Sequence, residues 1–404
     1  MDIRHVILPT MPARTSIALV ALIVGATALS GCTKLAQNFL GGVDNTEKPA
    51  ELTVIEPNGI SIDKIWTADV GSGSDKQYLR LTPVLANEQI FAADAEGRIA
   101  SFSAQTGEQA WQTDTEVNIT GGPGTDGLVV VVGSDDGDVI ALEAVDGTPR
   151  WRTRVSSEVL AAPKVADNTV VVRTIDGKLY GLDAADGKLR WSYDRSVPVL
   201  TLRGTSAPVI SRGIIVAGFD GGQLAAVSLD NGQPIWEVRL AVPRGRSEVE
   251  RLVDIDAPPI IADSTVYAVT FQGRVAALDL LSGEVLWRRD LSSHIGLSLD
   301  DDHVYVADAK SHLWALDRSN SSSLWRQSKL QARNITSPAV NGAFVVVGDL
   351  DGYVHWLSTE DGRQIARTQV GGGAILAAPI VAGDRVFVYS SDGTLAALRL
   401  NSGS

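Results

Sequence analysis

Residues Asp176–Trp191 read DGKLYGLDAADGKLRW, and this stretch decides the fold. Two Asp-Gly pairs, Asp176-Gly177 and Asp186-Gly187, enclose the strand-like segment 178–183 and precede Trp191. An Asp-Gly pair between such segments is a strong β-hairpin signal, because a type I′ turn needs positive φ at both central residues. The stretch therefore predicts consecutive antiparallel strands joined by tight turns.

The same pattern recurs along the chain. A short proline element marks each unit, at Pro83, Pro123, Pro163, Pro208, Pro258, Pro338 and Pro379, with intervals of 40, 40, 45, 50, 80 and 41 residues. The interval of 80 spans two periods, and Ser298 occupies the vacant position. Self-similarity at this period indicates a repeat architecture, here of eight units.

Each unit continues with an apolar run, a turn pair, a second strand, and a Gly followed four residues later by Trp. The turn pairs are Glu96-Gly97, Asp136-Gly137, Asp176-Gly177, Asp220-Gly221, Gln272-Gly273, Lys310-Ser311, Asp351-Gly352 and Asp392-Gly393. The Trp positions hold Trp111, Trp151, Trp191, Trp236, Trp287 and Trp325, with Ala366 in the seventh. We expect these Trp to pack one repeat against the next.

The strands are apolar on both faces, which predicts sheets buried on both sides. Four-stranded antiparallel sheets achieve this by stacking radially as propeller blades, and the hairpin turns argue against a parallel β-helix. The eighth unit stops where its Trp strand should begin, and Trp66 stands in a strand with no preceding unit. We therefore predict an all-β, eight-bladed β-propeller over residues 61–404, closed by the N-terminal strand around Trp66.

The N-terminus is typical of a targeting segment. Residues 17–29 are apolar and uncharged but too short to span a bilayer stably. Leu29-Ser30-Gly31-Cys32 resembles the bacterial lipobox, in which the cysteine is acylated after cleavage. We expect a cleaved lipoprotein signal peptide at 1–31 and a lipidated Cys32 with a flexible tether at 32–60; the alternative is an ordinary signal peptide with a chance cysteine.

Charge narrows the possible partners. The chain carries −13, and removal of Asp2, Arg4 and Arg14 (net +1) leaves −14 on the mature protein. Such a protein has no electrostatic footprint for nucleic acid, so we expect membrane attachment through the lipid anchor only. Thr33 replaces the Asp that usually retains lipoproteins at the inner membrane, which favours the periplasmic face of the outer membrane.

The repeat resembles that of pyrroloquinoline-quinone (PQQ) dehydrogenases, best seen in DAADGKLRW at 183–191 and DLLSGEVLW at 279–287. Together with the lipobox and the eight units, it resembles the BamB family of lipoproteins in the outer-membrane β-barrel assembly (BAM) complex. This resemblance implies a non-enzymatic scaffold without a cofactor. It would bind a periplasmic POTRA domain of the subunit BamA, and nascent outer-membrane proteins are a further possible partner.

Two connections between units are longer than the others. From Trp to the next Pro is 12 residues in tight units, but 17 after Trp191 and 22 after Trp236. Insertions at equivalent positions of adjacent repeats emerge on one rim, where binding surfaces often lie. In the BamB family the Leu-x-Leu-Arg and Asp-x-Asp of these segments grip BamA. This implies a partner-binding role for Leu200, Leu202, Arg203, Asp254 and Asp256, although an internal pairing of Arg203 with either Asp would also fit.

Two alternatives remain open: a quinoprotein of the PQQ-dependent dehydrogenase type, and a periplasmic propeller that binds a small ligand in its channel. The first is disfavoured because Cys32 is the single cysteine and leaves none for a vicinal disulfide. Asp135-Asp136-Gly137-Asp138 occupies the hairpin slot, so a turn is favoured over a metal loop. His294, His303, His312 and His355 lack the spacing of metal ligands. We expect no catalytic residues, no metal and no cofactor.

Overall fold

The structure is a computed structural model that describes residues 47–404 apart from 75–76, 196–205, 243–245, 248–251 and 403–404. Residues 1–48 and 49–404 form separate units, and the fold below is that of the second unit. Within the described ranges, no helix is long and apolar enough to cross a membrane.

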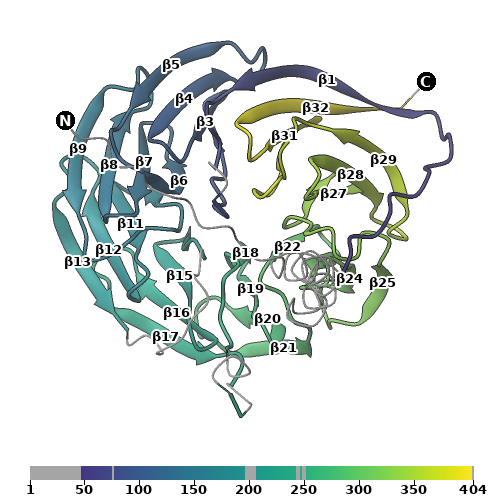
Figure 1. Ribbon diagram of the computed structural model, residues 1–404. Helices are drawn as coiled ribbons and strands as arrows, with labels where there is room; N and C mark the ends of the chain where they lie inside the picture. The colour runs from purple at the N-terminus through teal and green to yellow at the C-terminus, as the bar shows by residue number, and fades with distance from the viewer. Residues whose placement is uncertain (1–46, 75–76, 196–205, 243–245, 248–251, 403–404) are drawn as a thin grey trace, which may run out of the picture. The chain divides into compact units, whose positions relative to one another are not determined.

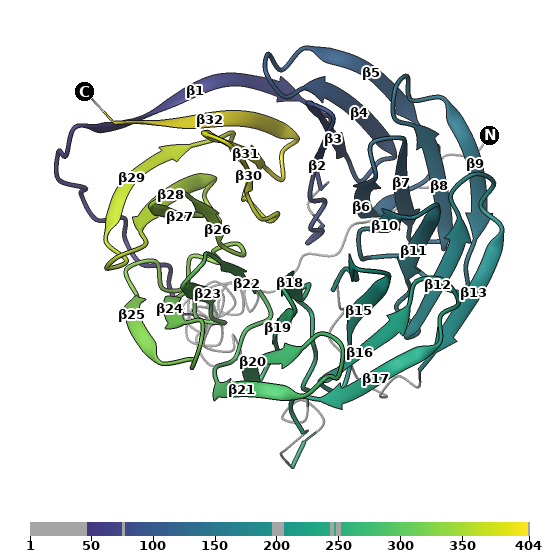
Figure 2. The same cartoon turned by 180° about the vertical axis from the view of Figure 1, so that it is seen from behind.

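The described residues of this unit contain 32 strands in eight four-stranded sheets, and neighbouring strands run antiparallel. The sheets stand around a central axis with their first strands innermost (Figures 1 and 2). The prediction of an eight-bladed β-propeller is confirmed.

The strands of each blade follow in chain order from the axis outward, with the outer strand of blade 8 supplied by β1. The inner strands are β2 (Val84–Ala86), β6 (Ile119–Thr125), β10 (Lys164–Ala166), β14 (Val209–Ser211), β18 (Ile260–Ala262), β22 (Gly296–Leu299), β26 (Ala339–Asn341) and β30 (Ile380–Ala382). The second strands are β3 (Gln89–Ala93), β7 (Val129–Ser134), β11 (Thr169–Arg173), β15 (Ile214–Phe219), β19 (Thr265–Val269), β23 (His303–Ala307), β27 (Phe344–Gly348) and β31 (Arg385–Tyr389). The third strands are β4 (Arg98–Ser103), β8 (Asp138–Glu143), β12 (Lys178–Asp183), β16 (Gln223–Ser228), β20 (Arg274–Asp279), β24 (Leu313–Asp317), β28 (Tyr353–Ser358) and β32 (Thr394–Ser402). The outer strands are β5 (Gln109–Asp114), β9 (Pro149–Arg154), β13 (Leu189–Asp194), β17 (Pro234–Arg239), β21 (Val285–Asp290), β25 (Ser323–Gln327), β29 (Gln364–Gln369) and β1 (Ile60–Asp69).

The ring closes as predicted. β1 pairs antiparallel with β32 from Ile60 opposite Ser402 to Asp69 opposite Thr394, with one irregularity between Lys64 and Trp66. The last blade therefore takes three strands from the C-terminus and one from the N-terminus (Figure 1). This closure leaves no blade short of an outer strand.

The tryptophans join successive blades. The Trp191 indole N–H donates to the Leu229 carbonyl of the next blade at 2.9 Å, and a Cβ at Gly232 would lie 2.6 Å from the Trp191 ring. The same indole bond recurs from Trp66, Trp111, Trp151, Trp236, Trp287 and Trp325 to Ala104, Ala144, Ala184, Leu280, Arg318 and Thr359. Each joint thus combines apolar burial with a satisfied indole N–H.

The eighth joint differs because Ala366 replaces Trp. Asn58 Nδ2 there donates to the Ile365 carbonyl at 2.8 Å, and Ile60 and Ile62 pack against the cluster that contains Ala366. Upstream, the Arg333 guanidinium donates to the Ala50 carbonyl at 3.0 Å. Residues 50–58, which the sequence assigned to the tether, therefore contact blades 6 and 7 at these points.

The hairpin turns differ from the expected type I′. Positive φ falls on the Gly of each Asp-Gly or Glu-Gly turn, as at Gly97 (φ 107°) and Gly177 (φ 85°), and the residue before it stays in the ordinary region. In blade 1 the turn spans four residues from Asp94 to Gly97, and its first residue caps the loop: Asp94 Oδ1 accepts the Arg98 N–H at 2.8 Å. A side chain that accepts hydrogen bonds from backbone N–H groups two to four residues later stabilises such a turn, in place of the second left-handed residue of a type I′ turn. The turn of blade 4 is the exception, because Gly221 and Gly222 both have positive φ.

Candidate functional site

The two lengthened connections run from β13 to β14 and from β17 to β18. Each links the outer strand of one blade to the inner strand of the next, on the rim that also carries the hairpins between second and third strands. We call this face the connection rim. Its part around blades 3 to 5 is the candidate site, because the longest connections emerge there.

Asp254 and Asp256 lie on this rim, but their side chains are buried. Residue exposure is 1% for Asp254 and 6% for Asp256. The Gly221 N–H donates to Asp254 Oδ1 at 2.9 Å, so this carboxylate holds the hairpin of blade 4. Ile255 between them is 1% exposed and packs where a Cβ on Gly218 would clash with it at 2.3 Å.

A third carboxylate and a buried arginine complete this cluster. Arg173 Nη2 lies 3.7 Å from Asp220 Oδ1, and both side chains are buried. The Arg173 guanidinium also stacks over the Phe219 ring, 5.5 Å from its centroid. Burying several charges together is favourable only when they compensate one another.

The electrostatics of the cluster follow from burial. Desolvation, with the neighbouring Asp254 and Asp220, raises the pKa of Asp256 to about 7, against the lowering effect of Arg173 and Arg80. Desolvation also raises the pKa of Asp220 to about 6, despite Arg173. The connection rim thus holds carboxyl groups that change charge near neutral pH.

The remaining predicted site residues, Leu200, Leu202 and Arg203, lie outside the described residues, as does Cys32. Sequence reasoning placed Asp254 and Asp256 in the lengthened connection but did not find their neighbours Arg173 and Asp220. The sequence contained a signal for both residues. Arg173 is a charged residue at the end of an otherwise apolar run, and Asp220 lies in the hairpin turn of the next repeat.

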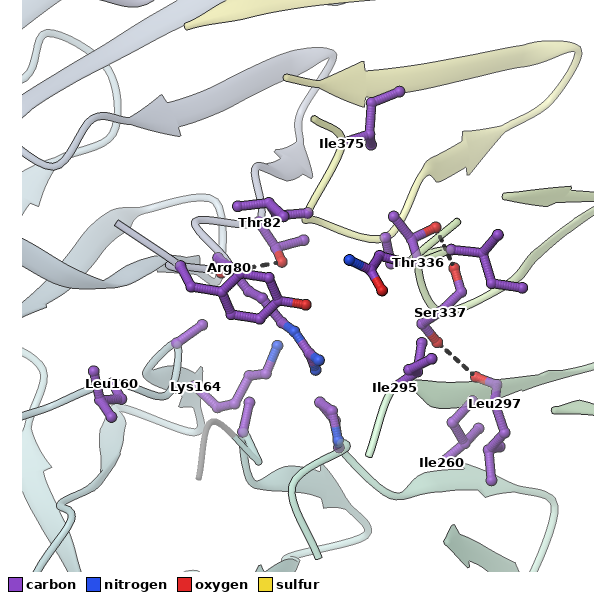
Figure 3. Close-up of a pocket in the computed structure, with 18 residues that line it drawn as sticks. Arg80, Thr82, Leu160, Lys164, Ile260, Ile295, Leu297, Thr336, Ser337 and Ile375 are labelled. Atoms are coloured by element: carbon purple, nitrogen blue, oxygen red, sulfur yellow. Dashed lines mark hydrogen bonds between the residues drawn. The ribbon is translucent and has the colours of Figure 1, made fainter. Parts of the chain in front are cut away.

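The channel opens on the connection rim as a cavity of about 220 Å³. Residues just before or at the start of the inner strands line it, and Arg80 and Lys164 extend into it (Figure 3). The sequence alone did not locate these residues, because a channel is formed by the ring and not by any one repeat.

Three histidines are paired with carboxylates and do not form a metal centre. His303 contacts Asp300 and His312 contacts Asp308, each at 2.9 Å. His355 Nε2 lies 2.9 Å from Asp349 and is buried. Within the described ranges no group of three or more His, Cys, Asp or Glu could hold a metal ion.

The fold is shared with known propellers. A quinohemoprotein alcohol dehydrogenase from Comamonas testosteroni superposes with a TM-score of 0.68 at 14% identity, covering 85% of this chain and 77% of that one. A likeness at this identity shows the fold alone, and the fold defines the class of this protein as an eight-bladed β-propeller.

Comparison of sequences assigns a family, which is a narrower group than the fold class. A family model described as outer membrane protein assembly factor BamB matches residues 95–327 and 322–404. Proteins of that name from Pseudomonas aeruginosa and Salmonella typhimurium are 48% and 34% identical, each over 93% of this chain and 97% of their own length. The crystal structure of BamB from Moraxella catarrhalis has a TM-score of 0.77 at 29% identity, covering 84% of this chain and all of that one.

The chain belongs to the BamB family of outer-membrane protein assembly factors. The family resemblance expected from the repeat and the lipobox is therefore confirmed. The family is one of assembly factors and not of quinoprotein enzymes, as predicted from the sequence.

Proposed function

We propose that this protein is a lipid-anchored scaffold of the outer-membrane β-barrel assembly machinery that binds a POTRA domain of BamA through its connection rim. The observation that carries the proposal is that the two lengthened connections leave adjacent blades on the same rim. Insertions on a rigid scaffold are where binding surfaces are commonly found. The Leu-x-Leu-Arg and Asp-x-Asp sequences lie in these two connections.

The burial of the two aspartates suggests a division of roles within this surface. Leu200, Leu202 and Arg203 would touch the partner, with the leucines as apolar anchors and the guanidinium as an orienting charge. Asp254 and Asp256, at 1% and 6% exposure, would act as positioning residues that fix the connection and supply its charge.

The lipid anchor completes the proposal. Acylation of Cys32 would hold the propeller to the periplasmic face of the outer membrane, because several acyl chains at about 0.8 kcal/mol per methylene bind almost permanently. The contact of Arg333 with Ala50 would pass tension from the tether to blades 6 and 7. Replacement of Cys32 by Ser should release the protein into the periplasmic fraction on cell fractionation.

The experiment that tests the partner is co-purification of BamA with the double variant Leu202→Ala/Arg203→Ala. We expect at least a tenfold loss of captured BamA, since removing a buried apolar anchor with an arginine contact typically costs about 2 kcal/mol or more. The matched control is Leu189→Ala/Arg190→Ala on β13, where Leu189 is 58% exposed and the composition change is identical. Undiminished capture by the first variant would refute the site.

A quinoprotein activity is the competing function on the same fold. Its test is incubation of the purified protein with PQQ and Ca²⁺, followed by measurement of alcohol oxidation with an artificial electron acceptor. We expect no turnover and no quinone absorbance that remains after desalting. Turnover would replace the scaffold proposal with an enzyme.

A further inference from the structure

The cavity at the channel mouth has an unusual charge for this protein. The whole chain carries −13, yet the described residues that line the cavity include Arg80 and Lys164 and no carboxylate. Both side chains extend into the same open space in Figure 3. A cationic cavity in an acidic protein needs a compensating anion or solvent.

Lys164 is the first residue of β10 and lies half-buried. Within the described ranges it forms no ion pair and no hydrogen bond through its ammonium group, and burial lowers its pKa. An ammonium group that is partly desolvated and lacks a carboxylate partner favours the binding of an anion.

Arg80 is held in place but keeps donors free for a ligand. Its Nη1 donates to the His294 carbonyl at 3.2 Å, and the other four guanidinium N–H groups have no partner in the described part of the chain. Asp256 partly offsets the charge of Arg80, since Arg80 lowers the pKa of that carboxyl. His294 adds no charge at neutral pH because burial, with Arg80, lowers its pKa.

The rest of the cavity wall is aliphatic. Leu160, Ile295, Leu297, Ile335 and Ile375 line it, and each is below 9% exposed. The volume of about 220 Å³ holds about seven water molecules at about 30 Å³ each. A ligand of similar size with one charged end and one apolar end would satisfy both parts of the wall.

We propose that the mouth of the propeller channel binds a small amphiphilic monoanion, with Lys164 and Arg80 holding its carboxylate and the aliphatic wall holding its chain. This site shares the connection rim with the proposed BamA surface, but Arg80 and Lys164, which would hold the ligand, are not among the residues assigned to BamA. It makes the channel a ligand site of the scaffold and not merely the empty axis of the ring.

The test is a ligand-observed NMR titration of the full mature protein with hexanoate. Hexylamine, which has the same chain and the opposite charge, and inorganic phosphate, which lacks the chain, are titrated in parallel. We expect millimolar binding of hexanoate and at least tenfold weaker binding of the other two. If hexylamine binds equally well, the site is not selective for anions. If phosphate binds equally well, the aliphatic wall contributes nothing to binding.

Variants locate the site. Lys164→Gln should weaken hexanoate binding at least fivefold, and Lys164→Arg, which keeps the charge, should bind within about twofold of the wild type. Lys188→Gln is the matched control, because it removes the same charge from an 82% exposed side chain outside the cavity. Unchanged affinity in Lys164→Gln, with its thermal transition preserved, would overturn the proposal; if that variant is destabilised, loss of binding in Lys164→Arg would do so.

Discussion

At the scale of single residues, a tryptophan and a glycine make each joint between blades. Gly232 (φ 69°) lies against the Trp191 ring, whereas a Cβ added to Gly213 (φ 73°) in the same blade would meet nothing within 4 Å. The two glycines therefore share a backbone conformation and differ in their contact. This pair separates the conformational cost of a side chain from the cost of disrupting a joint.

We predict that Gly213→Ala lowers the free energy of unfolding by about 1 kcal/mol, the cost of a left-handed alanine. Gly232→Ala should lower it by about 2–4 kcal/mol, because overpacking against the Trp191 ring adds about 1–3 kcal/mol. Urea unfolding of both variants measures the difference. Equal losses would mean that the glycine and tryptophan do not form a tight joint.

The buried carboxyl groups of the connection rim predict a pH dependence. The folded pKa of Asp256, about 7, lies above its ordinary value of 3.8, so between about pH 4 and 7 the folded protein binds a proton that the unfolded chain does not. Stability should therefore fall as pH rises through this window and level off above it. Asp220, at about 6, acts in the same direction.

Asp256→Asn should flatten this dependence, because an amide resembles the protonated carboxyl and does not titrate. The measurement is the urea midpoint of wild type and variant between pH 4.5 and 7.5. A variant with the full wild-type slope would show that Asp256 is not the titrating group.

The sequence could predict the tryptophan joints, since their spacing repeats, but not the charge cluster. Arg173 and Asp220 come from neighbouring blades, and Asp254 reaches them through a connection of irregular length. No local pattern encodes such a meeting. Ala366 was visible as a departure from the repeat, but only the structure shows that the fully buried Trp356 of β28 lies opposite it and packs in the same cluster.

At the scale of elements, β1 carries the closure of the ring. It pairs with β32 over nine residue pairs and sends Trp66 into the joint with blade 1. Without it, the hydrogen-bonding edge of β32 and the face of Gly107 would be exposed. The closing strand therefore stabilises two blades at once.

We predict that a chain beginning at Gly71, which lacks β1, loses cooperative thermal unfolding or melts at least 10 °C lower than a chain beginning at Pro57. Loss of a joint of this kind lowers the free energy of unfolding by several kcal/mol. A loss of about 1 kcal/mol shifts the melting temperature of a large domain by roughly 2–4 °C. Circular dichroism melting checks it. Coincident transitions would show that the ring closes without β1.

Turn type is where element-level prediction was wrong. The Asp-Gly pairs correctly placed the hairpins, but the loops of blades 1 and 7 have four residues and end in a left-handed Gly, with caps from Asp94 and Asp349. The Asp-Gly rule considers only two residues and takes no account of a side-chain acceptor earlier in the turn. The predicted strand positions were still correct, because a left-handed Gly reverses the direction of the chain in both kinds of turn.

At the scale of the whole molecule, the sequence predicted blade number and closure, since eight units and one orphan strand leave a single consistent ring. The channel and its charge were not predictable, because Arg80 and Lys164 come from segments 84 residues apart that only the ring brings to one cavity. The lengthened connections, the buried carboxylates and the channel mouth all lie on the connection rim.

The most direct test of the central claim is the affinity of the non-lipidated mature chain for the isolated POTRA domains of BamA, measured by isothermal titration calorimetry. We predict equal affinity for wild type and Leu189→Ala/Arg190→Ala, and at least tenfold weaker binding for Leu202→Ala/Arg203→Ala with an unchanged thermal transition. Equal affinity for all three proteins would contradict the assignment of the connection rim as the binding surface.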